Sequence, residues 1–113
     1  MPVTPEYRAF VLDQFRRIMP NVRDRAMFGG VGIYAGDLFF ALIADDTLYL
    51  KVDDRNRGAF EARGSGPFRP YGPEGEVMQY YELPADVLEE TDDLREWANA
   101  AVDVARRKRR KPR

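Results

Sequence analysis

The pattern of apolar and polar residues divides this chain into helical and extended segments. From Pro5 to Met19 apolar residues recur at helical spacing, while the charged residues fall largely on the opposite side. Thr4 and Pro5 are typical of a helix start, because the threonine side chain can accept a hydrogen bond from a free backbone N–H and proline fits the first helical position. The pattern therefore predicts a first helix over Pro5–Met19.

The segment Met27–Asp54 contains three short apolar runs separated by two turns. It predicts strands over Gly32–Ala35, Leu38–Ile43 and Leu48–Val52. Strands joined by turns this short must be antiparallel, because a parallel pair needs a crossover of a dozen or more residues. Nearly every residue of the second run is apolar, which indicates a central strand that is covered on both faces.

Further elements are predicted on both sides of this meander. They are, in chain order, a strand over Arg25–Phe28, a helix over Asp54–Arg63 capped by Asp53, a strand over Glu76–Glu82, a helix opened by Pro84 and a helix from about Asp92. The last two could be one helix bent at Thr91. This order predicts an α+β fold, in which the meander plus additional strands forms an antiparallel sheet with the helices packed on one face.

The composition restricts the chemistry that is available to the protein. The 113 residues, 44% of them apolar, are enough for one folded domain without disulfides, which we place over residues 1–105. There is no cysteine and no histidine, so thiolate zinc sites and every nucleophile that depends on a histidine base are excluded. We therefore expect a non-enzymatic protein that has no catalytic residue, cofactor or bound metal.

Two pairs of acidic residues are candidate metal ligands. Asp45-Asp46 and Asp53-Asp54 both lie at strand ends, where paired carboxylates could hold Mg²⁺ or transfer protons. A turn at the first pair and a helix cap at the second explain the same residues without a metal. We interpret both pairs as structural.

Charge is distributed unevenly along the chain. Residues 106–113 hold seven of the 18 basic side chains and no acid, whereas the other 105 residues hold 11 basic and 19 acidic side chains. We expect 106–113 to be a disordered basic tail that is either solvated or, as an extension of the last helix, contacts nucleic-acid phosphates. The residues that would make these contacts are Arg106, Arg107, Lys108, Arg109 and Arg110.

The turn before the meander is a candidate ligand site. It consists of Met27, Phe28, Gly29 and Gly30, and the bare backbone N–H groups of adjacent glycines can bind an anion. The alternative is that Gly-Gly lets a strand bend while Met-Phe fills the core. We favour the second interpretation, because no P-loop lysine follows and no helix begins there.

Lys51 is the second candidate, since it lies in a strand between apolar neighbours. It is either a binding cation surrounded by an aromatic wall or a solvated residue on the outer face of the sheet. Tyr49, Tyr80 and Tyr81 would form that wall, and together with Lys51 they make the protein-partner surface that we predict. These tyrosines and Phe39 could also stack on nucleic-acid bases, but the acidic body disfavours this.

The sequence contains no signal for membrane insertion or secretion. No apolar run approaches the roughly 20 residues that are needed to span a bilayer. The first residues lack the apolar core of a secretory signal. We therefore expect a cytoplasmic protein that does not contact membranes.

Four blocks of the sequence resemble the amino-terminal domain of the TfoX/Sxy family, the regulators of natural competence. The blocks are Met27-Phe28-Gly29-Gly30-x-Gly32-Ile33-Tyr34, Phe40-Ala41-Leu42-Ile43, Leu48-Tyr49-Leu50-Lys51-Val52-Asp53 and Tyr80-Tyr81-Glu82-Leu83-Pro84. Their order and spacing also match, and the similarity covers roughly Tyr7–Ala105. The resemblance implies a compact α+β domain that often dimerises.

The resemblance also implies a class of function. Two-domain members of the family continue into a helical domain to which DNA binding is ascribed, and we expect this chain to be a single-domain member without it. No catalytic residue is established for the family, so none is carried over. The implied function is a regulatory protein-interaction module, with a protein partner and a homodimer as its assemblies. Two alternatives stay open: a nucleic-acid accessory protein that uses the basic tail, and a small ligand-binding protein or enzyme.

Overall fold

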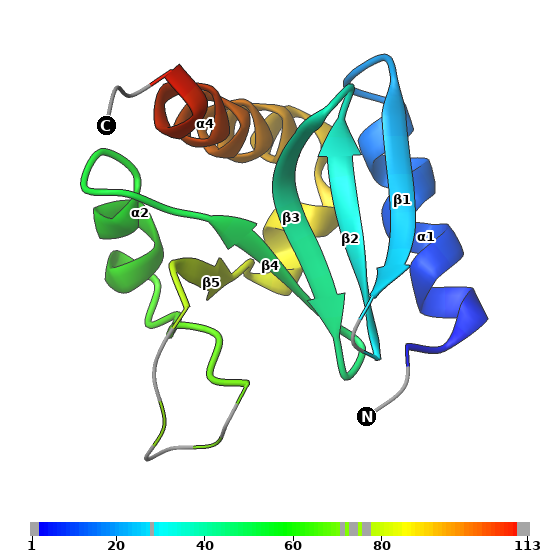
Figure 1. The fold of residues 1–113 in the computed structure, drawn as a ribbon, viewed down its shortest axis with the longest axis horizontal. Helices are drawn as coiled ribbons and strands as arrows, with labels where there is room; N and C mark the ends of the chain where they lie inside the picture. Colours follow the sequence, from blue (N-terminus) through cyan, green and yellow to red (C-terminus); the bar gives the residue numbers. More distant parts are fainter. Residues whose placement is uncertain (1–2, 28, 71, 73–74, 76–77, 111–113) are drawn as a thin grey trace.

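The computed structural model describes residues 3–27, 29–70, 72, 75 and 78–110, and these residues form a single antiparallel sheet with helices against it (Figure 1). The sheet has five strands in the spatial order β1-β2-β3-β4-β5. Its strands are β1 (Val22–Met27), β2 (Gly30–Ala35), β3 (Leu38–Ala44), β4 (Thr47–Lys51) and β5 (Tyr80–Glu82). The spatial order follows the chain order, so the meander that the sequence predicts is extended by one strand at each edge.

Four helices complete the fold. They are α1 (Pro5–Arg16), α2 (Arg57–Ala62), α3 (Ala85–Glu89) and α4 (Thr91–Arg110). In Figure 1, α1 lies beside β1, and α4 runs across the sheet near β3 and β4. This arrangement confirms the predicted α+β class and the packing of helices on one face. Among the described residues, no helix is long and apolar enough to cross a membrane.

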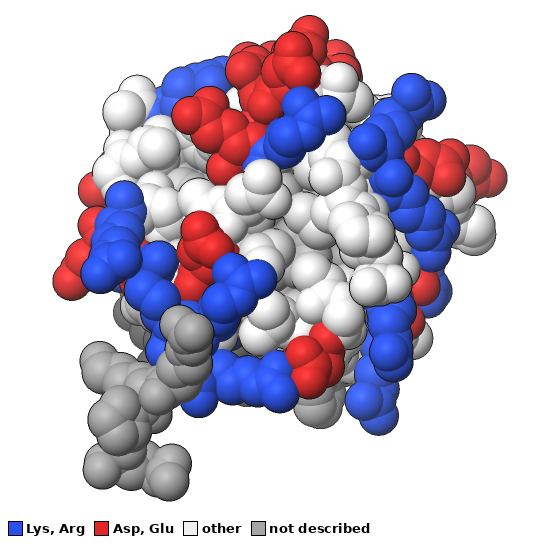
Figure 2. Space-filling model, turned by 90° about the horizontal axis from the view of Figure 1, so that it is seen from above, with Lys and Arg blue, Asp and Glu red and all other residues white. Residues whose placement is uncertain are grey.

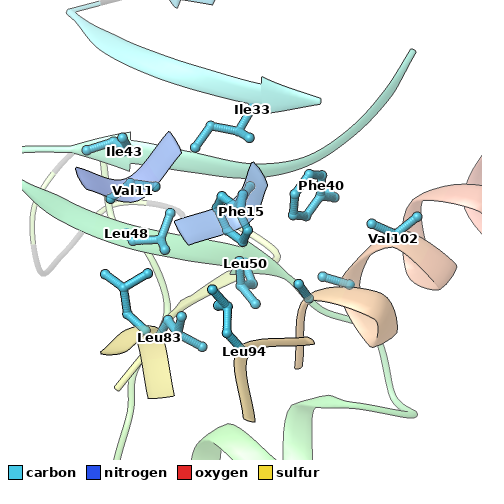
Figure 3. Packing of buried hydrophobic residues seen from close by; sticks show 14 of the residues in the cluster. Val11, Phe15, Ile33, Phe40, Ile43, Leu48, Leu50, Leu83, Leu94 and Val102 are labelled. Carbon is cyan, nitrogen blue, oxygen red and sulfur yellow. The ribbon is translucent and has the colours of Figure 1, made fainter. Parts of the chain in front are cut away.

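The hydrophobic core lies between the sheet and the helices α1, α3 and α4. Figure 3 shows Val11 and Phe15 of α1 among core residues of the strands, with Ile33 and Ile43 on one side of them and Leu48 and Leu50 on the other. Along β2, β3 and β4, residues that point into the core alternate with residues that point to the other face, apart from the bulge in β3. This pattern is expected for a sheet with one buried face. The fully buried members of this core include Phe15, Ile33, Phe40, Ile43, Leu48, Leu50 and Leu94.

A β-bulge in β3 places two consecutive residues, Phe40 and Ala41, on the core side of the sheet, while Phe39 lies on the other face. Ile33 pairs with Ala41 and Tyr34 pairs with Phe39, so Phe40 has no partner in β2. Phe40 packs edge-on against Phe15 in the core, with 5.2 Å between the ring centroids. Phe39 instead contacts Tyr34 on the other face, which we call the second face. A β-bulge is the usual device that re-aims a side chain in this way.

Several predicted boundaries differ from the structure. The first helix ends at Arg16 rather than Met19, because Asn21 turns the chain with a φ of 58° into β1. β1 begins at Val22, where it pairs with Ala35, and not at residue 25 as predicted. Phe28, the predicted end of that strand, lies outside the described residues.

The later helices also differ from their predictions. α2 begins at Arg57 after Asn56, so Asp53 is not its cap; the Asp53 carboxylate instead accepts a hydrogen bond from the backbone N–H of Arg55. The predicted strand 76–82 is observed over Tyr80–Glu82, and residues 76 and 77 lie outside the described part. α3 and α4 are two separate helices, because Glu90 between them has an extended backbone.

The last helix is longer than the sequence indicated. α4 runs for 20 residues and ends at Arg110, so the disordered tail predicted from residue 106 is corrected for 106–110. Side-chain pairs to other elements explain this extension. Arg107 pairs with Asp53 at 2.7 Å, and Arg109 pairs with Asp37 at 2.7 Å.

Candidate interaction site on the second face of the sheet

A row of aromatic side chains crosses the face of the sheet that lies opposite α1 and α4. The rings of Tyr34 and Phe39 stack with 5.0 Å between their centroids, and Phe39 lies 5.6 Å from Tyr80. The row therefore links β2, β3 and β5. Aromatic pairs at these separations stabilise one another beyond their burial alone, which gives this face a fixed shape.

Lys51 extends over this row from β4. Its ammonium nitrogen lies 5.3 Å from the centroid of the Tyr80 ring and 5.7 Å from that of Phe39, distances typical of cation–π contacts. Burial lowers the pKa of Lys51, and the positive charge of Lys108 lowers it further. The side chain is half-buried, so Lys51 is not the fully solvated residue of the alternative interpretation.

An apolar hollow of about 580 Å³ adjoins the aromatic row. Its walls come from the second-face side of β2 and β3 and from the segments around residues 68–70 and 78. The residues that line it include Met27, Gly29, Gly30, Phe39, Leu42, Phe68, Met78 and Tyr80. Sequence reasoning treated the turn at 27–30 and the surface around Lys51 as separate candidates. The structure brings Met27, Gly29 and Gly30 of the turn to the same hollow as Tyr80 of the Lys51 surface, while Phe28 lies outside the described residues.

Two glycines of β2 keep the strands and the aromatic row close together. A Cβ atom on Gly30 would lie 2.5 Å from the carbonyl oxygen of Ile43. A Cβ atom on Gly32 would lie 2.7 Å from the end of the Met27 side chain and 3.1 Å from the Phe39 ring. These glycines therefore serve close packing, which agrees with the structural interpretation of the Gly-Gly turn.

The aromatic wall predicted around Lys51 is wrong in one residue, Tyr81. Tyr81 points to the helix side of the sheet, where its ring lies 6.0 Å from Phe60 and its hydroxyl donates to Glu61 at 3.2 Å. Neighbouring residues of a strand face opposite sides, so Tyr80 and Tyr81 cannot both reach Lys51. Phe39 takes the place that the sequence assigned to Tyr81.

The two tyrosines that do face Lys51's side of the sheet have different roles. Tyr49 packs against Phe68, with 4.8 Å between the ring centroids, at the margin of the face. Tyr80 is buried, and this burial raises the pKa of its hydroxyl, with a smaller contribution from Tyr34. The Tyr80 hydroxyl therefore stays protonated at neutral pH, and Tyr80 contributes a ring and not a charge to the site.

Sequence reasoning missed Phe68, Met78 and Gly32 as parts of this site. Phe68 and Met78 lie in the long connection between α2 and β5, where no periodicity relates them to the sheet. The backbone N–H of Phe68 donates to the Tyr80 carbonyl at 2.7 Å, and that of Met78 donates to the Phe68 carbonyl at 2.9 Å. The only feature of the sequence that could have indicated these residues was the length of the connection, together with the aromatic strand that follows it.

The basic residues near the chain end lie apart from the hollow. Arg106 pairs with Asp103 within α4, whereas Arg107 and Arg109 pair with Asp53 and Asp37 of other segments. Figure 2 shows several basic side chains gathered at the lower left of the face in view, with acidic side chains among them. The side chain of Arg110 lies outside the described part of the structure.

The acidic pairs occupy turns. Asp45 and Asp46 both have positive φ values, 55° and 53°, in the turn between β3 and β4. The Asp46 carboxylate also accepts a hydrogen bond from the backbone N–H of Thr4 at 2.8 Å, which fixes the start of α1 to this turn. Asp53 and Asp54 each pair with an arginine. The carboxylates of Asp46, Asp53 and Asp54 therefore have structural partners, and Asp45 shapes the turn through its backbone.

Comparison with known proteins adds a family to this geometry. The model of the TfoX N-terminal domain matches residues 13–105, which is most of the 113-residue chain. No curated protein matches the sequence. The matched region begins within α1 and includes every strand that builds the second face. The chain belongs to the TfoX N-terminal domain family.

Proposed function

We propose that this protein is a non-enzymatic regulatory module that binds a protein partner through the second face of its sheet. The observation that carries the proposal is the aromatic row under a half-buried lysine, beside an apolar hollow, on the face that the helices leave uncovered. Aromatic residues and methionine are enriched at protein interfaces, and tyrosine is a frequent hot-spot residue. The family supports a regulatory role of the TfoX type.

The shape of the site also favours a macromolecular partner. Met78 is 40% exposed and borders the hollow, so its side chain is available to a partner. Lys51 supplies a positive charge at the centre of the face. A partner that inserts an apolar side chain into the hollow and places an acidic group near Lys51 would match both features. A second copy of the chain is one such candidate, because the family resemblance implies dimers.

The proposal is tested by charge substitutions on this face. Lys51→Glu and Met78→Glu alter half-buried or exposed side chains, whereas Tyr80→Ala would remove a buried ring and endanger the fold. The partner is first identified by affinity capture from the native cell extract, and its affinity for each purified variant is then measured by calorimetry. We expect each substitution to weaken binding at least tenfold.

The matched control reverses a charge elsewhere. Arg95→Glu changes an exposed residue near the start of α4, and among the described residues its ion pair is with Asp92 of the same helix. This variant should keep the affinity of the wild-type protein within twofold. Retention of full affinity by folded Lys51→Glu and Met78→Glu proteins would exclude the second face as the binding surface. Circular dichroism of each variant establishes that it is folded.

A further inference from the structure

A second hollow, separate from the aromatic row, lies where the end of α4 meets the segment between β4 and α2. It has a volume of about 530 Å³. Its lining is polar and charged over a floor of two valines. The residues that line it are Val52, Asp53, Asp54, Arg55, Arg57, Gln79, Val104, Arg107 and Lys108. We call this hollow the basic cleft, since four cationic side chains face two carboxylates.

Two arginines of the basic cleft are held in place by neighbours. Arg107 donates to one carboxylate oxygen of Asp53 through Nε at 3.2 Å and Nη2 at 2.7 Å. Arg57 donates to Asp54 at 2.6 Å and to the side-chain oxygen of Gln79 at 2.9 Å. A guanidinium carries five N–H donors, so each arginine keeps further donors for a ligand. Their orientation is fixed before any ligand arrives.

The other two cations of the cleft make no ion pair of this kind, although the charge of Arg55 also acts on Asp53. Within the described part of the chain, no carboxylate lies within 4.0 Å of the charged ends of Arg55 and Lys108. Lys108 moreover acts on Lys51, whose pKa it lowers by repulsion. The residues before 106 carry an excess of acid, so this end of the molecule is a local concentration of positive charge on an acidic body.

We propose that the basic cleft binds phosphate groups. Two cations in excess match the charge of about −1.5 to −2 on a phosphate monoester better than the single charge of a carboxylate. Arginine forks suit phosphate oxygens, and pre-oriented arginines lose little freedom on binding. The volume of the cleft exceeds that of an inorganic ion, so the phosphate belongs to a larger molecule, either a free nucleotide or a nucleic-acid strand.

Phosphate binding in the basic cleft should change the pKa of Lys51. A purely structural role of the cleft residues predicts no such change. An anion in the cleft would offset the repulsion between Lys108 and Lys51. The pKa of Lys51 should therefore rise when the ligand binds, because the charged form is stabilised. The rise in the pKa of Lys51 would also strengthen its charge over the aromatic row, since the Lys51 ammonium lies over Phe39 and Tyr80.

The test is an NMR titration of the full chain with pyrophosphate. We expect saturable shifts of the amide signals of residues 53–57 and 104–108, and a rise in the pKa of Lys51 followed through its side-chain ¹³Cε signal. Arg55→Ala with Lys108→Ala should weaken the affinity at least tenfold. Arg106→Ala is the matched control, because it removes an exposed cation of the same helix that pairs with Asp103 and does not line the cleft.

Parallel titrations distinguish the two sources of phosphate. Tighter binding of a nucleoside triphosphate assigns the cleft to free nucleotides, whereas tighter binding of a short single-stranded oligonucleotide, falling steeply with salt, assigns it to nucleic acid. Absence of any shift in the cleft with all three probes overturns the proposal, as does equal loss of affinity in the Arg106→Ala control. Partner binding through the second face is measured separately, so that a failure of the phosphate site and a failure of the second face as a binding surface are told apart.

Discussion

At the scale of single residues, the close approach of β2 to β3 depends on a missing side chain at Gly30. Alanine there would place its Cβ 2.5 Å from a backbone oxygen of Ile43, which cannot move without opening the sheet. We expect Gly30→Ala to lower the free energy of unfolding by about 1–3 kcal/mol, the range for overpacked sites. Urea denaturation of both proteins measures the difference.

A second glycine provides the control for this prediction. Gly58 lies inside α2, and apart from its chain neighbours and the helix backbone, no atom of the described residues lies within 4 Å of the position a Cβ would take. Gly58→Ala should raise the free energy of unfolding by about 0.4–1 kcal/mol, because alanine restricts the unfolded chain and favours the helix. If Gly30→Ala proves as well tolerated as Gly58→Ala, the close contact with Ile43 is not important for stability.

Lys51 predicts a dependence of stability on pH. Its pKa in the folded protein is lowered by burial and by Lys108, below the value of about 10.4 for an exposed lysine. The unfolded chain therefore binds more protons than the folded chain between these two values, so stability rises as pH rises through that window. Lys51→Met should abolish this part of the rise.

The measurement compares the two proteins by chemical denaturation at a series of pH values from 7 to about 10.5. The difference in unfolding free energy between Lys51→Met and the wild-type protein should shrink as pH increases. Tyrosines also titrate in this range, but they are common to both proteins and cancel in the difference. A difference that is constant over the whole range would show that Lys51 carries no burial cost.

At the scale of elements, a single buried side chain joins α1 to α3. Gln14 is buried, and its amide donates to the carbonyl oxygen of Leu88 at 2.9 Å. Leu88 lies in the last turn of α3, where carbonyl groups lack partners within the helix. Gln14→Leu keeps much of the volume but leaves this carbonyl unpaired, which should cost about 1–3 kcal/mol.

Thermal denaturation of Gln14→Leu tests this prediction against an exposed neighbour. Asp13 lies on the solvent side of the same helix, and Asp13→Ala should change stability by no more than about 0.5 kcal/mol. A Gln14→Leu protein as stable as the wild type would mean that the Leu88 carbonyl finds another donor, so that the contact between the two helices does not depend on Gln14.

The end of α4 depends on its pair with Asp53. Burial pulls the pKa of Asp53 upward, but the hydrogen bonds from Arg107 and from the Arg55 backbone hold it below the ordinary value. The pair is therefore present above pH 4 and is lost as pH falls through the lowered pKa. Asp53→Asn should speed amide hydrogen exchange in residues 104–108 at pH 6, whereas Asp103→Asn, which affects only a pair within α4, should not.

Much of the fold follows from local patterns, and the parts that do not have identifiable causes. Alternation in β4 and the short turns at Gly36 and Asp45 were sufficient for the meander. The bulge at Phe40 was not predictable, because two consecutive phenylalanines fit either face until their neighbours are placed. The length of α4 depends on Asp53 and Asp37, which are distant in sequence, so no helical pattern could reveal it.

The candidate site was predicted only in part for the same reason. Lys51 and Tyr80 were identified from residue type, and the turn at 27–30 was identified from its glycines. The turn and Tyr80 line one hollow, and Lys51 lies beside it over Tyr80 and Phe39; this arrangement depends on the register between strands and on Phe68 of the long connection. Tyr81 was assigned to the wrong face because the exact pairing of Tyr80 with Lys51 decides which of two adjacent tyrosines faces the lysine.

At the scale of the whole molecule, two surfaces with different chemistry lie on either side of Lys51. The second face of the sheet offers rings, thioethers and an apolar hollow, which suit a protein partner. The basic cleft offers oriented arginines and uncompensated charge, which suit phosphate. The Lys51 ammonium lies over aromatic rings of the second face, and Lys108 of the basic cleft lowers the pKa of Lys51. Binding at one surface should therefore influence the other.

The most direct test of the central claim is site-specific photocrosslinking in the native cell extract. A photoreactive phenylalanine analogue replaces Met78 at the rim of the hollow in one protein and Arg95 on α4 in another. We expect a discrete protein crosslink from position 78, reduced by Lys51→Glu, and none of that mass from position 95. Crosslinking to the same partner from position 95 and not from 78 would contradict the assignment of the second face as the interaction surface.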